Sequence, residues 1–395
     1  MFLGSTGWAG TIIASGTFDN GNAGTAVVHA EHSAVLLLDG RVFVNIGANT
    51  VSYNQIFDPV TRLWTNTAQA GAPIGGAARN VPATLLDDGR VIWAGSSVTT
   101  PYQATQAMIY DPVTDTNVEV ADLSAWRSKH SAWLMETGNI LITSGYDDIS
   151  ENMNESREYD PVNNVWIDDQ DQWFVRITDP GVWGPYPKTY TGNLVGANQF
   201  EFYPTTFGGI DNGPGYNQAS TRYVQVFYNG AWNYYDWLVT GRDSMTVSAV
   251  TPGLQSDRYL IIAGGKVMNN QAPPVYLSSC ELLDLSATYL DGLGHLRLVF
   301  SATGAMLEAR ADAASASLPV FRKAVVFGGH NDIDGALDTI EIYDSVTGTW
   351  SYDTTVMDDE RYGHTVTRLN DGTYLIAGGY DNAGNPLETW EIWQR

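Results

Sequence analysis

The chain repeats one pattern about every fifty residues, and this repeat restricts the fold more than any other feature. A run of alternating apolar residues leads into a tight turn, and a second apolar run follows and ends in glycine. The clearest copies are residues 32–48, 82–96, 130–146 and 364–380. A unit of this size cannot bury its own apolar face, so it must stack on neighbouring units.

Each unit contains the signals for four antiparallel strands. Seven glycines end the second run of successive units: Gly47, Gly95, Gly145, Gly208, Gly264, Gly328 and Gly378. Asp-Gly pairs between the first two runs favour two-residue hairpins, because both central positions need positive φ. Most units then show an aromatic-acidic pair and often a tryptophan, as in Tyr343, Asp344 and Trp350. No helical period is present, so we predict an all-β fold, a seven-bladed β-propeller of four-stranded antiparallel blades.

The better-preserved units resemble the kelch repeat. Arg361 and His364 open the last unit, and a double glycine ends its second strand at 378–379. This resemblance implies a propeller of the kelch and galactose-oxidase-like superfamily, in which the first strand of each unit is innermost. The first three units lack the second glycine. The fourth unit keeps only its double glycine and Trp232, so we predict a divergent fourth blade at residues 167–238.

The ring accounts for the whole chain as one domain, residues 1–395. The last unit ends at the place of a third strand, with Trp390 and Trp393. Residues 1–16 carry a β-branched run and precede the first unit. We therefore predict that they supply the fourth strand of the last blade and remove its exposed edge.

Cysteine content and hydropathy limit the kinds of site and the cellular locations that the sequence allows. Cys280 is the single cysteine, so an intrachain disulfide and a cysteine-based metal cluster are excluded, and we expect a buried structural thiol. No apolar run is long enough for a transmembrane helix, and the N-terminus lacks the pattern of a secretory signal. We therefore predict a soluble chain without membrane insertion, a prediction that fits a virion as well as the cytoplasm.

The charge excludes one class of partner. The net charge is -24, from 44 acidic and 20 basic residues. Such a field repels polyanions, so nucleic acid is not an expected partner. The simplest interpretation is that the acidic residues form a solvated surface without a particular partner, which keeps the protein soluble.

Five arginines stand at the entrance to a first strand, where the kelch resemblance places them around one mouth of the central channel. They are Arg79, Arg127, Arg242, Arg310 and Arg361. Guanidinium groups bind carboxylates in a bidentate manner, so at least three free arginines there would hold an acidic peptide or an acidic sugar. The alternative is that each pairs with a neighbouring carboxylate, such as Asp243, Asp312 or Asp358, and ties adjacent blades together.

A second candidate surface comes from aromatic residues around the fourth unit. Residues 166–237 hold 18 of the 46 aromatic residues. Several lie among prolines and glycines in a long loop, and the candidate ligand contacts are Trp173, Trp183, Tyr186 and Tyr190. Aromatic faces stack on sugar rings and anchor protein interfaces. The alternative is that these rings fill the gap left by a distorted blade.

A catalytic site is not evident in the sequence. Galactose oxidases, which this chain resembles in its glycine turns, use two tyrosines, one of them cross-linked to cysteine, and two histidines around copper. None of the six histidines directly follows a tyrosine, and Cys280 lies at a third-strand position. We therefore predict no cofactor and no metal. The acidic loops at 331–338 and 381–385 match no complete calcium-loop signature and are expected to be ordinary turns.

Two classes of function follow. The leading prediction is a non-enzymatic binding or assembly module that recognises a protein or a glycan, for example in a virion or at a cell surface. The alternative is a carbohydrate-active or oxidative enzyme with a non-standard site. A convergent acid pair or a histidine cluster in the channel would distinguish the second class, and the sequence shows neither.

Overall fold

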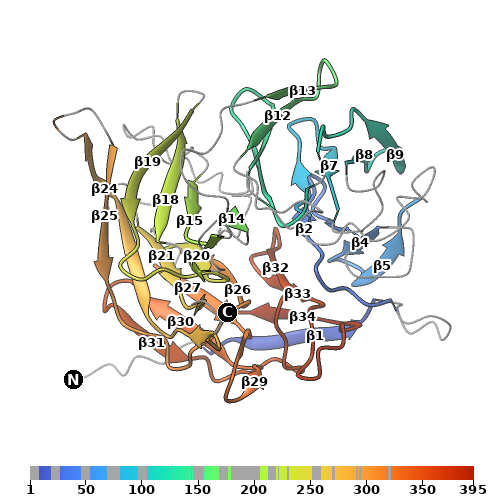
Figure 1. Ribbon diagram of the computed structural model, residues 1–395. Helices are drawn as coiled ribbons and strands as arrows, with labels where there is room; N and C mark the ends of the chain where they lie inside the picture. Colours follow the sequence, from blue (N-terminus) through green and yellow to red (C-terminus); the bar gives the residue numbers. More distant parts are fainter. Residues whose placement is uncertain are drawn as a thin grey trace.

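The computed structural model describes residues 9–18, 27–45, 54–68, 81–96, 105–125, 127–143, 145, 155–168, 177–178, 205–211, 219–220, 222–228, 231–250, 259–268, 272–290, 292, 296–318 and 322–395. Every regular element in these ranges is a β-strand, and the sheets stand around a common axis (Figure 1). Within these ranges, no helix has the length and hydropathy to cross a bilayer. The all-β propeller class is confirmed.

Six sheets have four antiparallel strands, and we number these blades by their sequence unit. Blade 1 contains β2 (Ala34–Leu36), β3 (Val42–Val44), β4 (Gln55–Asp58) and β5 (Leu63–Asn66). Blade 2 contains β6 (Thr84–Leu85), β7 (Val91–Ala94), β8 (Ala107–Asp111) and β9 (Thr116–Val120). Blade 3 contains β10 (Ser131–Leu134), β11 (Ile140–Thr143), β12 (Ser156–Asp160) and β13 (Val165–Asp168).

The C-terminal half of the chain forms the other three four-stranded blades. Blade 5 contains β20 (Thr246–Ala249), β21 (Tyr259–Ala263), β24 (Cys280–Leu290) and β25 (Leu296–Ala302). Blade 6 contains β26 (Ala314–Leu318), β27 (Lys323–Phe327), β30 (Ile340–Asp344) and β31 (Thr349–Tyr352). Blade 7 contains β32 (Thr365–Arg368), β33 (Tyr374–Ala377), β34 (Thr389–Gln394) and β1 (Thr11–Thr17). Two small hairpins join second to third strands, β22 (Lys266–Val267) with β23 (Val275–Tyr276), and β28 (His330–Asn331) with β29 (Gly335–Ala336).

The prediction of seven four-stranded blades is wrong in number, because the described residues form six. The fourth unit gives a three-stranded sheet of β15 (Thr205–Phe207), β18 (Tyr223–Tyr228) and β19 (Ala231–Trp237). Beside it in sequence, β14 (Ile177–Thr178), β16 (Ile210–Asp211) and β17 (Ala219–Ser220) make a separate small sheet. The three-stranded sheet packs on blade 5 through a shared apolar cluster that includes Phe207, Val224 and Ile262.

The ring closes where the sequence predicts. Strand β1 pairs antiparallel with β34, from Thr11 opposite Gln394 to Thr17 opposite Thr389, and Figure 1 shows the two strands side by side. Gly16 lies against Trp390, because a Cβ there would come within 3.0 Å of the indole ring. The absence of side chains at such positions lets β1 lie flat on the last blade.

Double glycines join each blade of the C-terminal half to the next one. The amide of Gly265 donates a hydrogen bond of 2.8 Å to the carbonyl of Arg310 in blade 6. The amide of Gly329 donates in the same way to Arg361 in blade 7, at 2.9 Å. Backbones of neighbouring blades approach so closely here that a Cβ on Gly264 would lie 2.5 Å from the carbonyl oxygen of Arg310, and a Cβ on Gly265 would lie 2.4 Å from that of Asp243 in its own blade. The kelch-like double glycine is therefore a packing requirement of the ring.

Replacing Gly265 by alanine is expected to lower the free energy of unfolding by about 3 kcal/mol, from backbone strain of about 1–2 kcal/mol and the overpacking. The matched control is Gly372→Ala, since Gly372 has nearly the same φ, +88° against +90°, and no atom within 4 Å of a Cβ. Gly372→Ala should lower the free energy of unfolding only by the backbone strain. Urea unfolding measures both, and equal losses would mean that the close approach contributes nothing.

Candidate functional site

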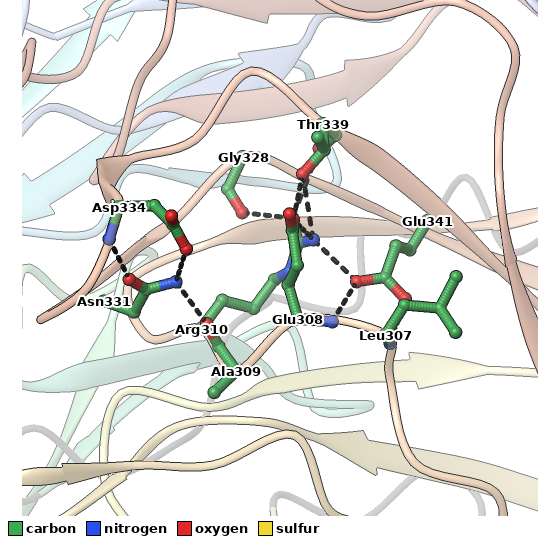
Figure 2. Close-up of polar contacts among 9 residues, drawn as sticks. All are labelled: Leu307, Glu308, Ala309, Arg310, Gly328, Asn331, Asp334, Thr339 and Glu341. Atoms are coloured by element: carbon green, nitrogen blue, oxygen red, sulfur yellow. Dashed lines mark hydrogen bonds and ion pairs between the residues drawn. The ribbon is translucent and has the colours of Figure 1, made fainter.

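The predicted arginines are structural in three of the five units. In blade 6, the Arg310 guanidinium is 1% exposed and contacts the buried Glu341 carboxylate at 2.6 Å (Figure 2). It also donates to the backbone carbonyls of Gly328 and Thr339, at 2.7 and 3.2 Å. Glu341 accepts two more hydrogen bonds from the amides of Leu307 and Glu308, at 2.7 and 3.1 Å. The pair thus fixes the segment that enters the innermost strand to the third strand of the same blade.

The same arrangement, which we call the clasp, recurs in blades 5 and 7. Arg242 contacts Glu281 at 2.9 Å, and Arg361 contacts Glu391 at 2.6 Å. Each glutamate again accepts from two amides on the segment before its arginine, at 239–240 and 358–359. Burial lowers the pKa of the Arg242 guanidinium, against the effect of Glu281. Every charge is therefore buried and paired, as a charge taken out of water requires.

The hypothesis of at least three free arginines at the channel mouth is wrong, because Arg242, Arg310 and Arg361 are buried in clasps. Each pairs with a glutamate of the third strand. Arg310 and Arg361 also pair with acids nearby in sequence, Glu308 at 2.8 Å and Asp359 at 3.4 Å, but not with the aspartates named from the sequence. Arg127 is also buried and donates to the carbonyl of Glu155 at 2.9 Å. Arg79 and the aromatic candidates Trp173, Trp183, Tyr186 and Tyr190 lie outside the described residues.

The structure brings a different set of side chains together at one end of the propeller axis. The first strands β20, β26 and β32 are neighbours around the axis. Just before each of them, a backbone bridge joins the residue after the arginine to the residue after the double glycine. These bridges pair Asp243 with Lys266, Ala311 with His330, and Tyr362 with Tyr380. Equivalent positions of three blades thus meet at one end of the axis.

We call this set the mouth ladder, and it consists of Asp243, Lys266, Tyr276, Asp312, His330, Tyr362 and Tyr380. All of its side chains except Asp243 are half-buried. Asp312 φ is +51°, and its amide donates to the carbonyl of Ser244 at 3.0 Å, while Gly363 donates to the carbonyl of Asp312 at 2.8 Å. A backbone chain of hydrogen bonds across three blades therefore fixes where the ladder stands.

Charged groups alternate along one side of the ladder. The Lys266 Nζ lies 3.8 Å from Asp243 and 3.4 Å from Asp312. Burial raises the pKa of the Asp243 carboxyl to about 6, although Lys266 and the hydroxyl of Ser220, at 2.6 Å, act against it. His330 Nδ1 lies 3.5 Å from Asp312 Oδ2, and burial lowers the pKa of this imidazole. At neutral pH the ladder therefore keeps more negative than positive charge.

Aromatic rings continue the ladder toward blade 7. His330 accepts or donates a hydrogen bond of 2.9 Å with the Tyr276 hydroxyl, depending on its tautomer. The His330 and Tyr362 rings are 4.5 Å apart, and Tyr362 stacks on Tyr380 with centroids at 5.5 Å and an interplanar angle of 28°. Three blades thus present polar atoms and ring faces in one continuous, partly exposed set.

The recurring histidines are not part of this surface. His32, His130 and His364 are buried, and burial lowers the pKa of each, in His130 to about 3. Cys280 is buried as expected, which raises its thiol pKa to about 11. Among the described residues, no three or more histidine, cysteine or acidic side chains are placed to hold a metal ion.

The two acidic loops are closed turns in this structure. Asn331 Oδ1 accepts from the amides of Ile333 and Asp334, and its Nδ2 donates to the Ala309 carbonyl at 3.0 Å (Figure 2). Asp381 accepts from the amides of Ala383 and Asn385 in the same manner. Their polar groups therefore stabilise the turns and, through Asn331, the segment before the first strand of the same blade.

Comparisons with known proteins agree with this architecture. Residues 322–356, which include most of blade 6, match the family model described as Kelch motif. No curated protein matches the chain. Among solved structures, the chain is similar to a novel fungal alcohol oxidase with catalytic diversity among the AA5 family, in complex with copper, with a TM-score of 0.67 and 17% identity. The match covers 98% of this chain and 76% of that one.

These findings confirm the predicted resemblance to kelch-repeat and galactose-oxidase-like propellers. At 17% identity, the likeness to the alcohol oxidase shows the fold alone. Sequence reasoning missed both the clasp glutamates and the mouth ladder. The glutamates follow a hydroxyl residue by two positions in each unit, at 279–281, 339–341 and 389–391. The ladder has its own signal, because Lys266, His330 and Tyr380 each follow a double glycine directly.

Proposed function

We propose that this chain is a recognition module that binds a protein partner at the mouth ladder. The observation that carries the proposal is the ladder itself, in which three blades present half-buried rings and polar atoms at one end of the axis. Contact residues that dominate binding are commonly aromatic or charged side chains of this kind. A rigid ring also holds them in place before the partner arrives, which limits the entropy cost of binding.

The ligand contacts and the location predicted from the sequence are further proposals. Trp173, Trp183, Tyr186 and Tyr190 stay candidate contacts for a protein or a glycan, and Arg79 stays a candidate ligand contact, whereas Arg127 is buried and does not. A place in a virion or at a cell surface is a prediction from composition. The carbohydrate-active or oxidative alternative gains no support from the likeness to an alcohol oxidase, which reaches only the fold.

The test is a screen of the whole chain against peptide and glycan arrays, followed by affinity measurements on the peptides that bind. Tyr362→Ala is expected to weaken binding at least about 10-fold, as loss of a central aromatic contact does. Val346→Ser is the control, because Val346 is 69% exposed in the β30–β31 turn, at the opposite end of the strands. Equal affinities of the two variants, or no peptide binding at all, would contradict the proposal.

A further inference from the structure

The ladder carries a net negative charge that its neighbours increase. Four carboxylates act on it: Asp243, Asp312, Asp332 and Asp381. Asp332 and Asp312 are among the groups that raise the pKa of the Tyr276 hydroxyl, after burial, and Asp381 acts in the same way on Tyr362. Against them the ladder has one ammonium group, Lys266, and a histidine whose burial favours the neutral form. An anionic ligand would therefore meet repulsion at this mouth.

Asp312 has an oxygen available for a ligand. Both of its cationic neighbours approach the same atom, Oδ2, at 3.4 Å from Lys266 Nζ and 3.5 Å from His330 Nδ1. Across the described ranges, Oδ1 has no hydrogen-bond or ion-pair partner. The side chain is 28% exposed. A carboxylate oxygen in this state is an acceptor for a donor that comes from outside.

The rings beside Asp312 favour the same kind of donor. The Tyr362 ring contacts both His330 and Tyr380, and the Tyr362 and Tyr380 rings stack with an interplanar angle of 28°. The face of a tyrosine ring attracts a cation electrostatically, and guanidinium groups also stack on such faces. An arginine or lysine side chain that reaches the ladder would contact both a carboxylate oxygen and an aromatic face.

We propose that the mouth ladder recognises a cationic side chain, arginine above all, in a basic segment of a protein partner. This inference rests on the proposed function and reverses the charge of the ligand that the sequence predicts, because the arginines that suggested an acidic ligand are inside the clasps. The chain's net charge of -24 complements such a segment at long range and speeds its arrival.

The experiment uses the full chain and fluorescent eight-residue peptides that contain two arginines, with matched peptides in which citrulline, a neutral isostere, replaces them. We expect the arginine peptides to bind at least about 10-fold more tightly at low salt than the citrulline peptides. Asp312→Asn should remove most of this difference. Glu119→Gln is the control variant, since Glu119 is an exposed acid on β9 and its substitution changes the net charge equally.

The outcomes separate this inference from the proposed function. Equal binding of arginine and citrulline peptides, or the same loss in Asp312→Asn and Glu119→Gln, overturns the cationic ligand. If the ladder variants instead weaken binding of an acidic or neutral peptide, the cationic ligand is wrong and the recognition module stands. If the ladder variants weaken only glycan binding, both the cationic ligand and the protein partner are wrong. Melting temperatures of all variants, within about 2 °C of the parent chain, confirm that the fold is retained.

Discussion

Replacing Glu341 by alanine is expected to lower the free energy of unfolding by about 3–5 kcal/mol, the usual loss when one partner of a buried ion pair is removed. The change removes the buried carboxylate from the Arg310 guanidinium, which keeps only the partly exposed Glu308 at 2.8 Å, and it takes away the acceptor of the Leu307 and Glu308 amides. Urea unfolding monitored by tryptophan fluorescence measures the effect. Glu281→Ala and Glu391→Ala should also be strongly destabilising, because each removes the buried carboxylate of an arginine and the acceptor of two amides.

The control for this prediction is Arg41→Ala. Arg41 and Asp39 form an ion pair of 2.7 Å, close to the 2.6 Å between Arg310 and Glu341. Both side chains of the Arg41 pair are partly exposed to solvent, at 35% and 47%. An exposed pair of this kind contributes about 0–1 kcal/mol. The double variant Arg310→Met with Glu341→Leu should recover part of the loss, since the fully buried charges of the pair are both gone and Glu308 is partly exposed. If Glu341→Ala costs no more than Arg41→Ala, the clasp is not a stabilising element.

Removing residues 1–17 is expected to lower the free energy of unfolding by on the order of 4 kcal/mol, since fully burying one large apolar side chain contributes about 1.5–3 kcal/mol. The deletion uncovers one side of Trp390 and Trp393, which Gly16 and Gly10 cover. It also removes the six backbone pairs between β1 and β34, and the Asp353 carboxylate loses the Gly10 amide, at 3.0 Å. The melting temperature should fall accordingly.

A synthetic peptide of residues 9–18 provides the matched test. Added to the shortened chain, it should pair with β34 and restore part of the melting temperature, as an added strand does at an open sheet edge. A peptide of the same composition in scrambled order should have no effect. An unchanged melting temperature after the deletion would mean that β1 does not stabilise the ring.

The sequence predicted the repeating parts of the fold well because the repeat is a local signal. Gly40 in its hairpin turn and the double glycine at 378–379 have positive φ, which few other residues adopt. The predicted two-residue Asp39-Gly40 turn is wrong in detail, because Asp39 has no positive φ and Leu37 and Arg41 close a three-residue loop. The closing strand followed from the place of Trp390 in the last unit. The number of four-stranded blades was wrong, because the fourth unit has lost most of the residues that mark strand ends, and its double glycine at 208–209 alone does not specify a complete blade.

The candidate site was harder to predict, since it depends on which residues share a space between blades. Arg310 and Glu341 are 31 residues apart, and nothing in the local pattern indicates that the glutamate of a third strand faces the arginine before the first. His330 and Tyr362 meet only because neighbouring blades place equivalent positions side by side. The pattern of a single unit identifies such positions, but the identity of the group opposite comes from the assembled ring.

The closing strand also sets an order of events during synthesis. Each clasp joins residues 30 to 39 positions apart, so it can form as soon as its own blade has left the ribosome. Strand β1 is made first and finds its partner last, because Thr17 receives the Trp390 indole hydrogen bond from 373 positions away. Until then, β1 and the open edge of blade 7 are both available to another chain. Exchange of β1 between two unfinished copies is therefore the misassembly to which this ring is most exposed.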